Sequence, residues 1–317
     1  MAALGRAWGQ DVATAGATVD TTPRVAIVLS SFTGSEDHDG TKIQGLADPS
    51  PVDADLSAVQ LDAMLRKAIS LGTTRRGGLT SIVASDDWVV IKTRIQTDPY
   101  LRGSVTDLRV VRSLIEFLVE HRCGARFTIA EGPESKAAAD GWISYDKMVR
   151  EFSRKYPKIA FDRVDLNFDE TIELPLRGKA LSYFIPKTIQ QCDRIISVAP
   201  LATSERTGVS LSVANYWGIA PGAHLKLGQP DEMLVDLFSY HPADYAIIGG
   251  ARAVHHNVLV AGTNAVSVDA VGAAIMGFDP TRVTHLALAQ HRGFGSADLG
   301  TIWTRGNEIE QARRPFR

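Results

Sequence analysis

Charged side chains follow two apolar runs of the chain, at positions where they could bind and transform a small polar molecule. Lys92 and Arg94 come after the run that begins at Trp88, and Glu131 comes after the run that begins at Arg126. Two neighbouring cations suit a carboxylate or phosphate group. A carboxylate beside them could move a proton. Lys92 and Glu131 are therefore candidate catalytic residues, and Arg94 is a candidate ligand-binding residue.

Each of these side chains also has a simpler explanation. Lys92 and Arg94 could be solvated residues where a strand leaves the sheet. Glu131 could be a carboxylate that accepts backbone N–H bonds at the Gly132 turn. The functional interpretation gains weight from the other polar strand ends, because the carboxyl ends of parallel strands meet at one edge of a sheet.

The segment Cys192–Gly228 is the strongest indication of a site. After the apolar run Arg194–Val198 it is rich in Ser, Thr, Gly, Ala and Asn and has no clear period. A compact domain rarely keeps so long an irregular segment unless it binds or covers something. Because Thr203–Ser212 offers few apolar anchors, we expect it to be mobile without a ligand. The candidate ligand-binding residues in this segment are Thr203, Ser204, Asn215 and Lys226, and His224 is a candidate for acid–base catalysis.

Other polar residues and the two cysteines are weaker candidates for a functional site. Asp269 is a further candidate for ligand binding, although a carboxylate early in a helix is also favoured by the helix dipole. His255 and His256 are weak candidates for metal binding, because adjacent residues of a strand point to opposite faces. We therefore predict no metal site. Cys123 and Cys192 are expected to be two buried thiols, and two cysteines cannot hold a four-cysteine iron–sulfur cluster.

Strands and helices alternate along the chain, which predicts an α/β fold. The sheet should be doubly wound and largely parallel or mixed, with helices on both faces and with a smaller second lobe as an alternative. The runs Val25–Leu29, Val89–Ile91, Phe127–Ala130 and Ile195–Val198 lack alternation, so we expect them in one sheet covered on both sides. Predicted helices cover Asp55–Leu71, Thr106–Arg122, Gly141–Lys155, Pro230–Tyr240, Asn264–Gly277 and Asp279–Arg292.

Composition excludes several classes of protein. The 317 residues carry a net charge of −2 without a block of like charge, which argues against binding to nucleic acid or to a membrane surface. No apolar run is long enough for a transmembrane helix, and residues 1–23 lack the apolar core of a signal peptide. We expect a flexible arm over 1–23, an α/β domain over 24–317 with sub-lobes 24–190 and 191–317 as an alternative, and a cytoplasmic location.

Seven motifs follow one another over most of the chain: VVIKT, TDLRVVRSLIEFL, IAEGP, VDLN, CDRIISVAPL, TGVSLSVANYWGIAPG and AVSVDAVGAAIMGFDP. In type and order they resemble the motifs of the domain-of-unknown-function family DUF362. The resemblance implies no particular activity. Lys92, Glu131, Asn215 and Asp269 match their motif positions.

The chain departs from the family pattern around the candidate site. Ala202 and Ala214 stand where the pattern usually has lysine, and Ser204 stands where it usually has histidine. The loop after Gly249-Gly250 is shortened. These differences imply either a different, less charged ligand or a loss of the ancestral chemistry.

Two classes of function therefore stay open. The first is an enzyme that acts on a small anionic or polar metabolite in a cleft at the carboxyl ends of the strands, with metal dependence as a variant. The second is a non-catalytic small-molecule-binding protein or degenerate paralogue. The cofactor, the reaction and the oligomeric state do not follow from the residues.

Overall fold

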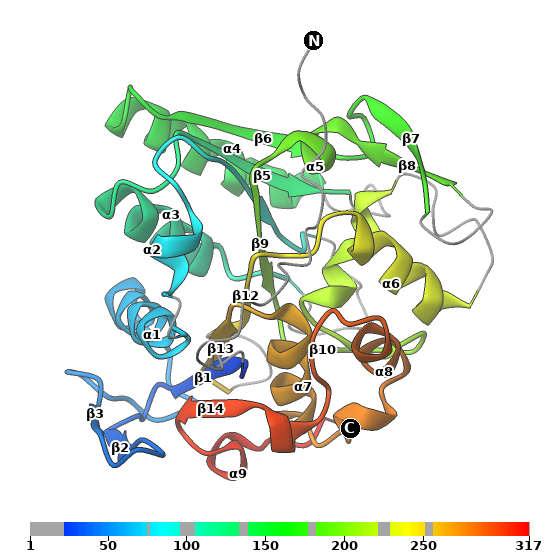
Figure 1. The fold of residues 1–317 in the computed structure, drawn as a ribbon. Helices are drawn as coiled ribbons and strands as arrows, with labels where there is room; N and C mark the ends of the chain where they lie inside the picture. Colours follow the sequence, from blue (N-terminus) through cyan, green and yellow to red (C-terminus); the bar gives the residue numbers. More distant parts are fainter. Residues whose placement is uncertain are drawn as a thin grey trace, which may run out of the picture.

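An eight-stranded sheet forms the centre of the protein, with strand order β14-β1-β13-β12-β9-β4-β5-β6. The computed structural model describes residues 22–74, 77–95, 105–132, 139–176, 182–220, 229–250 and 256–316 (Figure 1). The strands of this sheet are β1 (Arg24–Leu29), β4 (Trp88–Lys92), β5 (Arg126–Glu131), β6 (Ala160–Asp165), β9 (Arg194–Ala199), β12 (Tyr245–Gly250), β13 (Val258–Gly262) and β14 (Trp303–Gly306).

The sheet is mixed, but only one of its strands runs against the others. β13 pairs antiparallel with both β1 and β12, and every other neighbouring pair is parallel. The four apolar runs expected in one sheet lie in β1, β4, β5 and β9 and point the same way, as predicted. Their side chains are buried on both faces, which explains why the sequence does not alternate.

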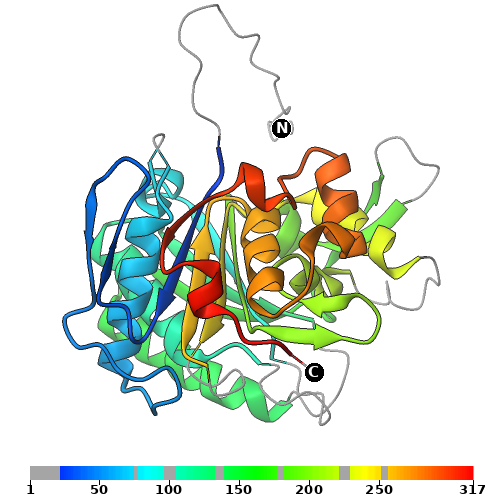
Figure 2. The same cartoon turned by 90° about the horizontal axis from the view of Figure 1, so that it is seen from below.

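Helices cover both faces of the sheet, so the fold is the predicted doubly wound α/β type (Figure 2). One face packs against α1, α3 and α4, and the other against α5, α6, α7 and α8. The helices are α1 (Ala58–Leu71), α2 (Leu79–Ile82), α3 (Leu108–Glu120), α4 (Ala139–Lys155), α5 (Lys187–Gln191), α6 (Pro230–Tyr240), α7 (Ala265–Ile275), α8 (Thr284–His291) and α9 (Ile309–Ala312).

Two helices differ from those predicted from the sequence, one in its N-cap residue and the other in its continuity. The N-cap of α3 is Asp107 and not Thr106, because the Thr106 hydroxyl is already bonded to the backbone of Arg94 and Val198. The predicted helix Asp279–Arg292 is divided into a short 3-10 turn, Pro280–Arg282, and α8. Asp279 caps the turn by accepting a hydrogen bond from the Thr281 N–H.

Within the described ranges, three two-stranded hairpins lie outside the main sheet, and none of them was expected from the sequence. Short strands carry little periodic signal, because each contributes only a few side chains to one face. They are β2 (Gly34–Glu36) with β3 (Lys42–Gln44), β7 (Thr171–Pro175) with β8 (Ser182–Pro186), and β10 (Ala202–Ser204) with β11 (Gly208–Ser210).

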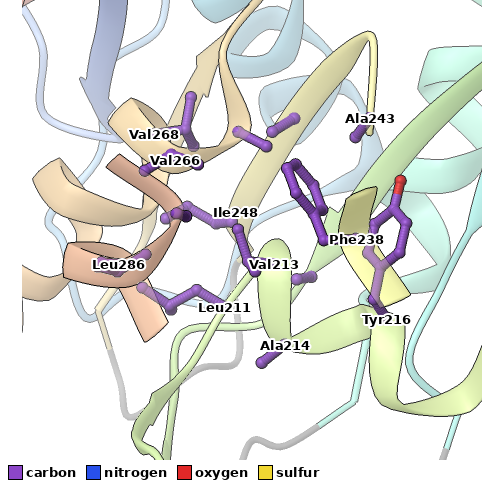
Figure 3. Packing of buried hydrophobic residues seen from close by; sticks show 14 of the residues in the cluster. Leu211, Val213, Ala214, Tyr216, Phe238, Ala243, Ile248, Val266, Val268 and Leu286 are labelled. Atoms are coloured by element: carbon purple, nitrogen blue, oxygen red, sulfur yellow. The ribbon is translucent and has the colours of Figure 1, made fainter. Parts of the chain in front are cut away.

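The central segment is more regular and better anchored than its composition suggested. The β10–β11 hairpin is followed by a 3-10 helix, η2 (Val213–Ile219). Leu211, Val213 and Tyr216 lie in the core formed with α6, α7 and α8 (Figure 3). The Tyr216 hydroxyl also donates to the His241 carbonyl. Thr203–Ser212 itself contributes only two apolar anchors, Val209 and Leu211, both buried. Its mobility without a ligand stays a prediction.

The sheet is continuous across the boundary between the two alternative sub-lobes, because β9 pairs with both β4 and β12. The arm 1–23 lies almost wholly outside the described residues. Cys123 and Cys192 are buried free thiols, as predicted. Within the described ranges, no helix combines the length and the apolar character needed to cross a bilayer.

Candidate functional site

The direction of chain winding changes between β4 and β9, and this places the candidate site. From β4 the chain proceeds to β5 and β6, toward one edge of the sheet. From β9 it proceeds to β12 and β13, toward the other edge. Open α/β sheets bind ligands outside the carboxyl ends of the strands at such a switch point. Here those ends carry Lys92 on β4 and Val198-Ala199 on β9.

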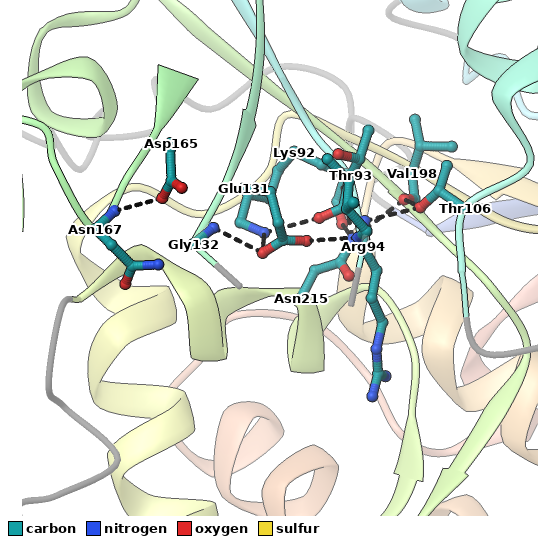
Figure 4. Close-up of polar contacts among 12 residues, drawn as sticks. Lys92, Thr93, Arg94, Thr106, Glu131, Gly132, Asp165, Asn167, Val198 and Asn215 are labelled. Atoms are coloured by element: carbon teal, nitrogen blue, oxygen red, sulfur yellow. Dashed lines mark hydrogen bonds and ion pairs between the residues drawn. The ribbon is translucent and has the colours of Figure 1, made fainter. Parts of the chain in front are cut away.

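An ion pair between Lys92 and Glu131 lies beside this point. Lys92 Nζ is 2.7 Å from Glu131 Oε1 (Figure 4). The Lys92 side chain is 0% exposed, so it is not a solvated residue at a strand exit. Burial lowers the pKa of Lys92, while the charge of Glu131 and its hydrogen bond oppose that change. The pair is therefore a desolvated acid and base in direct contact.

Backbone groups complete the surroundings of both side chains. Glu131 Oε1 also accepts from the Gly132 N–H at 2.9 Å, and Oε2 accepts from the Ile95 N–H at 3.2 Å. The bond at the Gly132 turn is the simpler role foreseen for Glu131. Lys92 Nζ donates to the Thr93 carbonyl at 2.8 Å. An ammonium has three N–H donors. Lys92 therefore keeps one donor that no residue in the described ranges accepts.

Two glycines allow η2 to approach the Glu131 carboxylate. A Cβ on Gly132 would lie 2.1 Å from the Gly218 carbonyl oxygen, and one on Gly218 would lie 2.5 Å from Glu131 Oε1. Neither distance can be accommodated without moving backbone or the carboxylate. Close approach of β5 and η2, and not the flexibility of a loop, explains glycine at both positions.

Substitution of Gly132 by alanine should therefore destabilise the protein by overpacking. We expect Gly132→Ala to lower the free energy of unfolding by about 1–3 kcal/mol. Gly208→Ala is the matched control, because Gly208 has no atom within 4 Å of its Cβ position and carries only a left-handed φ of 74°. Urea unfolding of both variants measures the difference. A smaller loss for Gly132→Ala than for Gly208→Ala would contradict the close approach.

Asn215 closes the gap between the two strand ends. Its Nδ2 donates to the Lys92 carbonyl at 3.3 Å, the Val198 carbonyl at 3.2 Å and the Ser197 hydroxyl at 3.1 Å. Two carbonyl acceptors require the amide nitrogen at this position, which fixes the orientation of the side chain. Its Oδ1 is buried and has no partner among the described residues.

Asp269 acts on the site through η2. Its carboxylate accepts from the N–H groups of Ser212 and Val213 at 2.9 and 2.7 Å, so it caps the start of η2 from the neighbouring helix α7. Burial raises the pKa of Asp269 to about 8, and the two N–H bonds act against the increase. Asp269 therefore positions the element that carries Asn215, rather than responding to the dipole of its own helix.

The remaining described candidates do not join Lys92 and Glu131. The Arg94 side chain extends away from that pair in Figure 4, and its guanidinium donates to the Ser210 hydroxyl of β11. Ser204 Oγ accepts from the N–H groups of Arg206 and Thr207 in the hairpin turn. Thr203 lies in β10. The Lys92 and Arg94 side chains thus contact different groups in this structure, and their joint binding of one anion stays a prediction.

Of the candidate histidines and Lys226, only His256 lies within the described residues. His224, Lys226 and His255 lie outside the described residues. His256 is buried, and its Nε2 contacts the Ala312 carbonyl oxygen at 2.7 Å. Burial lowers the pKa of His256. In the described part of the chain, no three His, Cys, Asp or Glu side chains gather in a group that could hold a metal ion.

A family model described as a domain of unknown function, DUF362, matches residues 89–288. The chain belongs to the DUF362 family. The matched region extends from β4 to α8, so it contains the switch point and all of η2. No curated protein matches the chain.

Membership in DUF362 confirms the resemblance seen in the sequence motifs. The residues that match those motifs, Lys92, Glu131, Asn215 and Asp269, belong to one connected region around η2 and the strand ends. Ala202 and Ala214, at the positions where the sequence resemblance implies lysine, are both buried. In this chain the two positions contribute apolar packing where the pattern would add charge.

Several further polar residues of this region were not candidate site residues in the sequence. Ser197 links β9 to η2, because its hydroxyl accepts from Asn215 and donates to the Ser212 carbonyl. Thr106 ties the ends of β4 and β9 together. Thr93 and Tyr145 contribute buried hydroxyls. Only the place of Thr93 after a strand was visible in the sequence, since the other three lie within apolar or unremarkable local patterns.

Proposed function

We propose that this chain is an enzyme that acts on a small anionic or polar metabolite at the carboxyl edge of the sheet. The desolvated Lys92–Glu131 pair at the winding switch point carries the proposal. A buried ion pair is often no more stabilising than apolar residues of the same volume. The free energy needed to desolvate the two charges is understandable if the pair takes part in a reaction.

The chemistry best suited to this pair is proton transfer. Glu131 would accept a proton from the substrate and return it to the product. The Lys92 N–H that no described residue accepts would bind the substrate oxygen on which negative charge develops. Such preorganised donors in a water-poor site stabilise charge more strongly than they do in water. Arg94 would contribute to the attraction of an anionic substrate from the side of the β10–β11 hairpin.

Replacement of Glu131 tests this role. Once turnover is found by screening small carboxylic acids and phosphate esters, Glu131→Gln should lower kcat/KM by roughly 100-fold or more, as for loss of a general acid–base group. The control is Glu151→Gln, since Glu151 forms an exposed ion pair with Arg112. A loss below about tenfold in folded Glu131→Gln protein would remove Glu131 from the mechanism.

A second candidate function is binding without catalysis. It is favoured by the fact that both oxygens of Glu131 already accept hydrogen bonds and that Lys92 is enclosed. The apolar side chains of Ala202 and Ala214 also favour binding without catalysis. Binding of compounds from the same screen, measured by calorimetry and without turnover of any of them, would support this alternative.

A further inference from the structure

Two buried hydroxyls lie at the carboxyl edge, and among the described residues neither has a hydrogen-bond partner other than the second hydroxyl. Thr93 directly follows β4, and its backbone is fixed by an N–H bond to the Ala130 carbonyl. Tyr145 comes from α4, on the α1, α3 and α4 face of the sheet. Thr93 is 0% and Tyr145 4% exposed. The two hydroxyls interact with each other, although outside strict hydrogen-bond geometry, and neither has another donor or acceptor among the residues that the structure describes.

The electrostatic surroundings determine what these hydroxyls can bind. Burial raises the pKa of the Tyr145 phenol well above its usual range, and the neighbouring Thr93 hydroxyl opposes the increase. The charges of Glu131 and Asp107 raise that pKa further. The phenol therefore stays protonated and can donate. The two hydroxyls carry no charge and the Lys92 cation near them is already paired with Glu131, so they suit a neutral oxygen better than an anionic group.

A further donor lies on the same helix. Trp142 Nε1 is buried and likewise has no described acceptor, and the Trp142 ring meets the Tyr145 ring edge-on with centroids 6.1 Å apart. An indole N–H can only donate. Among the described residues, this side of the carboxyl edge thus gathers two hydroxyls and an indole N–H with no acceptor outside the group.

We propose that Thr93 and Tyr145 bind a neutral oxygen of the ligand, a carbonyl or hydroxyl group, beside the Lys92–Glu131 pair. This inference rests on the proposed site at the carboxyl edge and adds a part of the ligand to it. The ligand would place a neutral oxygen at the two hydroxyls and a polar or anionic group toward Lys92. A carboxylic acid amide or a hydroxy acid has both a neutral oxygen and a second polar or anionic group, whereas inorganic phosphate has no neutral carbonyl or alcohol oxygen.

Stability provides the first test and needs no ligand. A buried hydroxyl without a partner destabilises the folded state, so its removal without a change of shape should stabilise it. Tyr145→Phe and Thr93→Val should each raise the melting temperature by about 1–3 °C. A lower melting temperature in both variants would overturn the inference, because the hydroxyls would then have structural partners.

Binding of small probes provides the second test. Ligand-observed NMR with acetamide, acetate and inorganic phosphate compares a neutral carbonyl with two anions. We expect acetamide to bind the full chain and Tyr145→Phe to weaken it by about fivefold or more, as for loss of one hydrogen bond. The matched control is Tyr245→Phe. Tyr245 is also a buried tyrosine without a described partner, but it lies at the opposite end of the strands.

The outcomes separate this inference from the proposed function. Acetamide binding that is unchanged in both Tyr145→Phe and Thr93→Val, or equally weakened in Tyr245→Phe, would overturn the hydroxyl site. Failure of acetamide to bind at all would also overturn it. Acetamide binding that depends on Tyr145 supports the site even if Glu131→Gln leaves turnover unchanged, and in that case only the catalytic role of Glu131 fails.

Discussion

Replacement of Lys92 by methionine should destabilise the protein by about 3–5 kcal/mol, the range for removal of one partner from a buried ion pair. Methionine preserves most of the side-chain volume, so the loss reports the charge left behind on Glu131. Chemical unfolding of the variant measures it. Lys155→Met is the matched control, because Lys155 pairs with Glu116 at the surface with 51% of its side chain exposed. Exposed pairs contribute at most about 1 kcal/mol.

A double variant distinguishes the loss of the pair from a packing defect. Lys92→Met combined with Glu131→Gln removes both charges and leaves an amide that still accepts a backbone N–H bond. We expect this double variant to recover most of the stability lost in Lys92→Met, since the uncompensated charge is gone. If the two single losses simply add, the pair is not coupled and its assignment as a desolvated acid–base unit is wrong.

The second large effect is a pH dependence of stability that originates at Asp269. Its pKa is about 8 in the folded protein and 3.8 ordinarily. Between these values the folded state holds a proton that the unfolded chain releases, so stability falls as the pH rises. The contribution is complete below pH 3.8 and is lost as the pH approaches about 8. The slope for one proton reaches roughly 1.4 kcal/mol per pH unit.

The difference between the parent and Asp269→Asn isolates this effect from other titrating groups. Unfolding free energies at pH 5, 6, 7 and 8 should converge or cross as the parent weakens and the variant does not. Asp279→Asn is the control, since Asp279 is an exposed cap whose pKa is lowered by hydrogen bonds from Thr281. Parallel curves for parent and Asp269→Asn would show that Asp269 stays ionised when buried against η2.

The main elements of the fold could be predicted because local pattern and tertiary role agree in them. Val25–Leu29 and Ile195–Val198 are continuous apolar runs because both of their faces are covered, and Pro230–Tyr240 is bounded by a proline at its first turn. The hairpins β2–β3 and β7–β8 could not be predicted in this way. Their stability comes from contacts with distant parts of the chain, which leave no period in a few residues.

The candidate site was only partly visible for the same reason. Lys92 and Glu131 could be selected because they follow apolar runs, and strand ends converge in any parallel sheet. Their mutual contact, their complete burial and the separate direction of Arg94 depend on side-chain packing between segments far apart in the chain. Tyr145 occupies an apolar helical face, where a buried tyrosine resembles any other core residue.

The sequence by itself determined the α/β class, the parallel direction of the central strands and the membership of the chain in DUF362. Each of these follows from patterns within single segments or from their order. The tertiary structure alone decided that Lys92 is paired and not solvated, and that Asp269 caps η2 and not its own helix. Both outcomes depend on which groups meet across the switch point. A buried charge is stable only with hydrogen-bond partners, so those partners, more than the residue type, determine the role of each charged side chain.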